Sequence, residues 1–491
     1  MLNNLYRRIV DNRLWVWGVV AMVLLGSVIL GLRASFLWLL VLGAGAGALV
    51  LLNWPSIGLF ALVVAALVGR VEISTGTAVV VNPVTLLVPA MLALWALDMV
   101  RKREWHIVPS RANLPLFLYL LAGLLSLLVG NALWDPAVPR TGSFAIVQIA
   151  QWAVFTFSAG AFWLTGNLIK DEVSLSRLTY VFFAVAGGLF VLLTALALPT
   201  RNIYDATLIY YIATVGIYHA PLIMLLTALT GGQLLFNKKL SGGWRLFLVV
   251  ILAAVLLYAF YIDRDRASTW VGVVSALGIL AWSRWPRLRW PVVTLVVILA
   301  ITGVLSSAVY QFAGGDAEWE ESGGSRLTLI SRVIEVTMHN PITGLGPAAY
   351  RPYARVTPLQ YGRALWFEPQ ISSHNNYVDL FAHGGLVGLG LFLWFAVEFT
   401  LICLRVRSRA IPSFQTGFAG GYVNGMLAAW GGSLVLMMFA DWILPFVYNI
   451  GFPGFQASLL VWLFLGGVLV LEDMEETETS GDHGEMKVSV S

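Results

Sequence analysis

Apolar runs of about twenty residues follow one another along almost the whole chain. A helix of about that length spans the hydrocarbon core of a bilayer, because each residue rises about 1.5 Å. Of the 491 residues, 59% are hydrophobic and only 11% are charged, whereas a soluble domain carries about 25% charged residues. Lipid is therefore the expected solvent for most of this chain.

The runs predict an all-α fold, a polytopic membrane helix bundle of about 12 to 14 transmembrane helices. The third and tenth runs are short, so each either merges with a neighbour or turns back within the membrane. The candidate spans lie near residues 14–32, 36–52, 56–69, 78–99, 114–133, 144–169, 178–198, 211–236, 244–262, 268–283, 290–312, 378–403, 418–439 and 455–471.

Basic residues gather in every second connection, which sets the orientation by the positive-inside rule. With a cytoplasmic N-terminus, the inside connections hold every lysine and clusters such as Arg101–Arg103 and Arg284–Arg289, while the short outside connections hold scattered arginines. We expect a multi-pass protein of the bacterial cytoplasmic (inner) membrane with both termini in the cytoplasm. The net charge of +4 gives no sign of nucleic-acid binding.

The spans leave one connection far longer than the others, of roughly 65 residues. We therefore divide the chain into an N-terminal transmembrane bundle (1–312), a large extracytoplasmic loop (313–377), C-terminal transmembrane helices (378–471) and a disordered acidic cytoplasmic tail (472–491). The loop is rich in aromatic and aliphatic residues, so it is expected to fold onto the membrane bundle.

Within the loop, apolar residues at helical spacing predict a helix from Ser325 to Met338, followed by a Gly-rich turn at 344–347. His374 comes just before the twelfth span, at a predicted helix start on the outer membrane surface. Free backbone N–H groups there attract anions and disfavour a protonated imidazole. A neutral imidazole is suited to act as a general base.

At these residues the chain resembles the O-antigen ligase and O-antigen polymerase superfamily of polytopic bacterial glycosyltransferases. His374-Asn375 is followed after nine residues by Gly385-Leu386-Val387-Gly388, similar to the family's histidine–amide and Gly-x-x-Gly signature. The helix led by Arg326 and its Pro341–Pro347 turn resemble a second family element. Arg266-Ala267-Ser268 resembles the outer Ser-Arg-Gly element more loosely, with Asp265 and Ala267 at the serine and glycine positions.

The resemblance implies an inverting, metal-independent transfer of a glycan from an undecaprenyl-diphosphate donor to a hydroxyl of a glycan, lipid or protein. His374 is expected to deprotonate or orient the acceptor, and Arg326 and Arg266 to stabilise the leaving diphosphate. We expect further substrate contacts from Asn375, Arg201, Gly344 and Gly346. Neither a cofactor nor a metal is expected, because one cysteine and six scattered histidines do not form a ligand set.

Other functions remain open. Ligase, polymerase and protein O-glycosyltransferase share these motifs. A lipid or solute transporter would have broken helices at mid-membrane, for which Asn82-Pro83 and Gly231-Gly232 are the only hints, and no internal repeat is visible. A non-catalytic scaffold for glycan assembly is the third possibility.

Overall fold

The computed structural model describes residues 45, 47, 50–74, 80–105, 107–203, 207–264, 266–303, 324–361, 364–409 and 411–485. The predicted span 14–32, most of the span 36–52 and the loop residues 313–323 lie outside the described residues. Internal contacts divide the chain into two units, Met1–Pro55 and Ser56–Ser491. The second unit carries every residue predicted to form the site.

The described part of the chain is mostly helical, with two short antiparallel hairpins. The α-helices are α4 (Pro55–Leu67), α5 (Pro83–Lys102), α6 (Asn113–Ala132), α7 (Phe144–Leu168), α8 (Glu172–Phe182), α9 (Gly188–Ala197), α10 (Thr207–Ile212), α11 (Ala220–Phe236), α12 (Gly242–Leu257), α13 (Ala267–Arg284), α14 (Arg289–Ile301), α17 (Gly324–Thr337), α18 (Tyr350–Ala354), α19 (Asn376–Arg407), α20 (Pro412–Thr416), α21 (Phe418–Leu436) and α22 (Gly451–Glu485). Short 3-10 or π segments are η1 (Phe183–Gly187), η3 (Val215–Tyr218), η4 (Tyr258–Ile262) and η5 (Pro286–Leu288). The strands are β1 (Ile73–Ser74), β2 (Val80–Val81), β3 (Leu359–Tyr361) and β4 (Ala364–Trp366).

Within the described residues, 7 helical segments are long and apolar enough to cross a membrane. They are α5, α6, α7, the continuous α8–η1–α9 segment, the α12–η4 segment, α19 and α22. Two shorter apolar helices, α4 and α11, lie at further predicted spans, and so do α13, α14 and α21. The expectation of an all-α polytopic membrane protein is confirmed.

Helix α22 occupies the centre of the second unit. Its most apolar stretch is completely buried inside the protein, and it packs against α7, α11, α19 and α21. The rings of Trp430 on α21, Phe395 on α19 and Trp462 on α22 interlock there, with centroids 5.6 to 6.4 Å apart. These buried aromatic contacts hold the helices that carry the site in fixed register.

The predicted span 211–236 is divided in the structure. Helix α10 and the 3-10 segment η3 precede α11, which begins only at Ala220. Pro221 lies in the first turn of α11, where its missing N–H costs nothing and its fixed φ favours a helix start. The apolar composition indicated one span but did not show this break.

The last helix extends beyond the predicted end of the final span. Helix α22 reaches Glu485, whereas we expected a disordered tail to begin at residue 472. The first residue of that tail is held in place, because Arg405 pairs with the Glu472 carboxylate at 3.2 Å and Arg409 donates to the Glu472 carbonyl at 3.2 Å. These two contacts fix the chain at Glu472.

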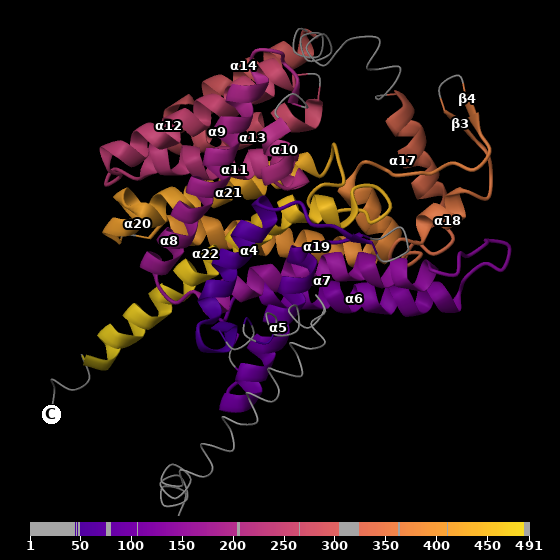
Figure 1. Ribbon diagram of the computed structural model, residues 1–491, viewed down its shortest axis with the longest axis horizontal. Coiled ribbons are helices and arrows are strands. Elements are labelled where there is room, and N and C mark those ends of the chain that lie inside the picture. The colour runs from indigo at the N-terminus through magenta and orange to yellow at the C-terminus, as the bar shows by residue number, and fades with distance from the viewer. Residues whose placement is uncertain are drawn as a thin grey trace, which may run out of the picture. The chain divides into compact units, whose positions relative to one another are not determined.

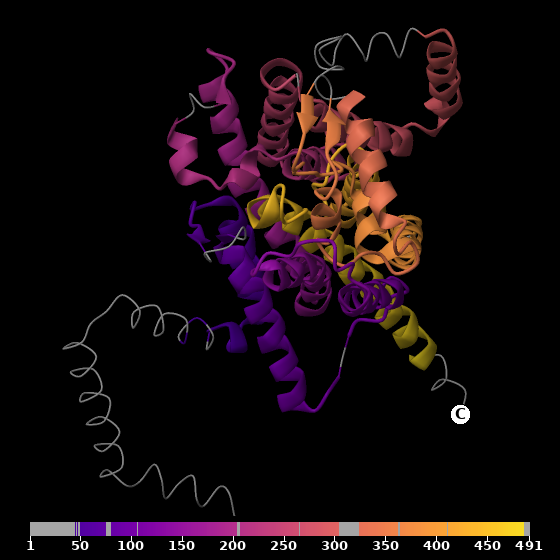
Figure 2. The same ribbon diagram turned by 90° about the vertical axis from the view of Figure 1, so that its right-hand side faces the viewer.

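The described loop elements gather at one end of the helix bundle, where α17, α18 and the β3–β4 hairpin lie beside the ends of α6, α7 and α19 (Figures 1 and 2). The predicted helix Ser325–Met338 is confirmed as α17, Gly324–Thr337. Tyr353 of α18 packs on Trp134 at 4.9 Å between ring centroids and accepts a hydrogen bond from the Asp135 N–H at 3.0 Å. The loop is thus fixed to the connection between α6 and α7.

Candidate active site

His374 stands immediately before the first turn of α19. The next residue, Asn375, caps the helix: its side-chain oxygen accepts from the N–H groups of Tyr377 and Val378 at 3.0 and 3.2 Å. The same amide donates to the carbonyl of Met438 at 3.0 Å. We expected Asn375 to contact substrate, and the structure places both ends of its amide in hydrogen bonds that fix the helix start.

The backbone of His374 is left-handed, with φ 49°. Such a conformation is costly for a residue with a side chain and persists where the surroundings impose it. It is imposed here by the cap that follows and by Ser373, whose hydroxyl is buried, accepts from the Asn375 N–H at 3.0 Å and lies 2.7 Å from Asp379 Oδ1.

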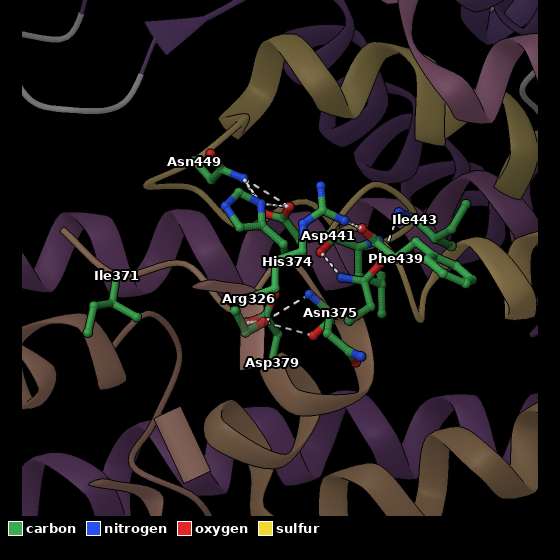
Figure 3. Close-up of polar contacts among 12 residues, drawn as sticks. Arg326, Ile371, His374, Asn375, Asp379, Phe439, Asp441, Ile443 and Asn449 are labelled. Atoms are coloured by element: carbon green, nitrogen blue, oxygen red, sulfur yellow. Dashed lines mark hydrogen bonds and ion pairs between the residues drawn. The ribbon is translucent and has the colours of Figure 1, made fainter. Parts of the chain in front are cut away.

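The imidazole of His374 faces a carboxylate from a distant part of the sequence. Its Nδ1 lies 3.8 Å from Oδ1 of Asp441, in the segment between α21 and α22. Asn449 contacts both residues: its amide nitrogen donates to the two Asp441 oxygens at 2.9 and 3.0 Å and lies 3.5 Å from His374 Nδ1 (Figure 3). Nδ1 is turned towards the carboxylate, so Nε2 is the nitrogen available for a substrate.

Burial and charge act on this pair in opposite directions. Burial lowers the pKa of His374, the negative charge of Asp441 raises it, and the positive charges of Arg326 and Arg351 lower it; the net shift is downward. Burial raises the pKa of Asp441, against the opposing effect of His374. The imidazole is therefore neutral at neutral pH, in the form that accepts a proton, and the imidazolium it forms has a counter-charge nearby.

Arg326 belongs to the first turn of α17 and reaches the same cluster. Its Nη1 donates to the carbonyl of Phe439 at 3.2 Å, two residues before Asp441 in the sequence. Its charge acts on His374 through space. The structure therefore brings Arg326 and His374 together, from the two halves of the loop.

The Pro341–Pro347 turn fits into a break in α19. Gly385 is non-helical, with φ 64° and ψ −164°, so the next two N–H groups, of Leu386 and Val387, lose their partners within the helix. Their acceptors are carbonyl oxygens of the turn, those of Pro341 and Ile342, at 2.9 and 3.2 Å. The turn and the helix break thus complete each other.

The two turn glycines allow this close approach. Gly344 has φ 77°, and a Cβ there would lie 2.5 Å from the backbone nitrogen of Gly385. Gly346 has φ 103°, and a Cβ there would lie 3.3 Å from the Gln148 amide and from the Ser126 carbonyl. We expected both glycines to contact substrate, and the structure places them in backbone packing against α19, α6 and α7.

Arg266 and Arg201 both contact the end of the α12–η4 segment. Within the described residues, no contact joins either of them to His374. Arg266 pairs with Asp263 at 3.7 Å and remains 45% exposed. Arg201 stacks on Tyr261, with its guanidinium carbon 4.1 Å from the ring centroid. Arg266 acts electrostatically on His219, whose ring packs 4.4 Å from that of Trp442, next to Asp441 in sequence.

Two members of the cluster were not assigned from the sequence. They are Asp441 and Asn449, both in the segment between α21 and α22. A usable signal was present, because Asp441 is the single acid between Glu398 and Glu472 and follows a span that ends on the same side as the loop. Among the described residues, no three His, Cys, Asp or Glu side chains form a group that could hold a metal ion.

A family model described as O-antigen ligase matches residues 251–393. The matched region begins in α12, includes the described loop elements and ends within α19, so it contains His374, Arg326, Arg266 and the turn that fills the break in α19. No curated protein matches this chain. Residues 251–393 are therefore similar to the O-antigen ligase family, in agreement with the histidine and glycine motifs.

Proposed function

We propose that this protein transfers a glycan from an undecaprenyl-diphosphate donor to a hydroxyl acceptor at the extracytoplasmic face of the bacterial inner membrane. The family match supports the ligase or polymerase type of reaction. The observation that carries the proposal is the His374–Asp441 pair with Arg326 beside it, at the end of the bundle where the loop folds. The distribution of lysine in alternate connections supports the outward orientation.

The proposed reaction is a single displacement. The acceptor oxygen forms a bond to the anomeric carbon while the bond from that carbon to the diphosphate oxygen breaks, so the configuration inverts. The acceptor proton passes to Nε2 of His374, and Asp441 stabilises the imidazolium. The departing undecaprenyl diphosphate gains one negative charge.

Arg326 is placed to receive that negative charge. A guanidinium binds phosphate oxygens in a bidentate manner and stays protonated. Arg266, whose charge acts on His219, and Arg201 are proposed to hold the donor's distal phosphate or first sugar. Because the diphosphate is already an activated leaving group, the transfer needs neither ATP nor a bound metal.

Replacing His374 with alanine tests the proposal. The variant and the wild type are reconstituted in liposomes with a lipid-linked glycan donor, and glycan transfer is measured separately from membrane insertion. We expect insertion to be unchanged and kcat to fall by about 10² to 10⁴. His339→Ala is the matched control, because His339 lies in the same loop, where its ring bonds the Val336 carbonyl at 2.9 Å and packs on Tyr353.

The products separate the related functions. Glycan on a lipid or protein acceptor indicates a ligase, and a longer glycan on undecaprenyl diphosphate indicates a polymerase. Substrate flux into liposomes without bond transfer would point to the transporter instead. Normal transfer by correctly inserted His374→Ala protein would remove this mechanism.

A further inference from the structure

Arg351 is a buried arginine beside the site, on the short helix α18. Its side chain is almost enclosed, with the residue 8% exposed. Its Nε donates to the carbonyl of Ile371 at 2.9 Å, and its Nη1 donates to the carbonyl of Tyr448 at 2.9 Å. The guanidinium also stacks near two rings, 5.1 Å from the centroid of Phe446 and 4.8 Å from that of Tyr448.

The two carbonyls belong to the two segments that form the His374–Asp441 pair. Ile371 is three residues before His374, and Tyr448 is one residue before Asn449. In the sequence, the first segment precedes α19 and the second follows α21. The Arg351 guanidinium therefore joins the segment that carries His374 to the segment that carries Asp441 and Asn449.

The contacts use properties that only arginine has. Nε and Nη1 point in fixed, different directions from one rigid plane, whereas a lysine ammonium is a point charge on a flexible stem. The charge also lies among buried acids, since Asp441 and Asp379 both act on Arg351 electrostatically. Both aspartates are at most 2% exposed, so a nearby fixed cation offsets the free-energy cost of burying their charge.

We propose that Arg351 is a positioning residue, which holds the His374 segment and the Asp441–Asn449 segment in register for transfer. This inference rests on the proposed function. Arg351 does not touch substrate, because its burial and its two carbonyl partners leave its charge inside the protein. It acts through the distance between His374 Nδ1 and Asp441, which stands at 3.8 Å.

The experiment compares Arg351→Lys and Arg351→Met with wild type in the same liposome assay. Arg355→Met is the matched control, because Arg355 lies four residues on and pairs with the exposed Glu368 at 2.9 Å. Misplacing a catalytic group by about 1 Å can cost about 10² in rate. We expect kcat to fall between about tenfold and 100-fold in both Arg351 variants, with KM for the donor within about twofold, and Arg355→Met to match wild type.

The pH profile of kcat gives a readout that loss of stability alone would not move. The charged groups facing His374 are Asp441, Arg326 and Arg351. Arg351→Lys keeps the positive charge, so the acid limb should stay in place. Arg351→Met removes it, so the pKa of His374 rises and the acid limb moves to higher pH.

Normal kcat in Arg351→Lys, with the acid limb of Arg351→Met unchanged, overturns this inference while leaving the proposed function intact if His374→Ala is inactive. Arg351→Lys decides the matter if Arg351→Met fails to insert, since lysine retains the stem and the charge. An active His374→Ala variant overturns the proposed function itself, whatever the Arg351 variants do.

Discussion

Replacing Asp441 with asparagine should move the pH dependence of transfer in a defined direction. The amide is nearly isosteric but has one acceptor oxygen where the carboxylate has two, so the change removes the negative charge and one of the two hydrogen bonds accepted from Asn449. Asp441 Oδ1 lies 3.8 Å from His374 Nδ1, with side-chain exposures of 2% and 38% respectively. The negative charge favours the imidazolium, so its loss lowers the pKa of His374 further.

The size of the effect follows from that distance and exposure. Two unit charges at about 4 Å interact by about 1 kcal/mol in water and about 4 kcal/mol at an effective dielectric constant near 20. A half-exposed ring beside a buried carboxylate lies between these limits, at about 2 kcal/mol. That value corresponds to about a 30-fold loss of kcat if the imidazolium forms in the transition state.

The assay is the initial rate of glycan transfer in liposomes from about pH 4.5 to pH 8, a range that spans the usual pKa of histidine. We expect the acid limb of Asp441→Asn to move to lower pH and kcat at pH 7.5 to fall about 30-fold. Glu368→Gln is the control, since that carboxylate is 76% exposed in the same loop. An acid limb that stays in place, or moves to higher pH, would refute the pairing of Asp441 with His374.

Two further predictions concern the turn and the chemistry. Gly344→Ala should lower the free energy of unfolding by at least about 2 kcal/mol, because a left-handed φ costs about 1–2 kcal/mol and the new Cβ would lie 2.5 Å from the Gly385 nitrogen. Thermal unfolding in nanodiscs measures this loss. The control Gly384→Ala should be close to wild type, since nothing lies within 4 Å of its Cβ. Equal melting temperatures for the two variants would contradict the packing argument. Transfer should persist after exhaustive treatment with EDTA, and a loss of activity that Mg²⁺ or Mn²⁺ restores would show that the leaving diphosphate depends on a metal rather than on arginine.

Much of the site was predicted from local sequence signals. Span positions followed from apolar length, because lipid accepts only segments whose backbone bonds are satisfied internally. The helix α17 followed from the spacing of Leu327, Ile330 and Ile334. His374 and Arg326 stood out because they belong to motifs with fixed spacing, and the structure brings both to one cluster.

The partners of those residues depended on contacts between distant segments. Asp441 and Asn449 meet His374 across a sequence separation of about 70 residues, and Arg351 reaches Tyr448 across a separation of 97. No periodicity or spacing encodes such a meeting. The same holds for Gly344 and Gly346, whose motif was visible but whose role emerged only from the break in α19 that they fill.

The amino-acid sequence by itself indicated a polytopic membrane protein and the long loop that carries the polar motifs, because both follow from the length of the hydrophobic segments along the chain. Only the tertiary structure decided which acid faces the imidazole, which arginine stands beside it and which arginine is buried to hold the segments together. Those pairings depend on how α17, α18, α19 and the α21–α22 connection pack against one another. Packing of this kind is a property of side-chain shapes in three dimensions, which a linear pattern does not record.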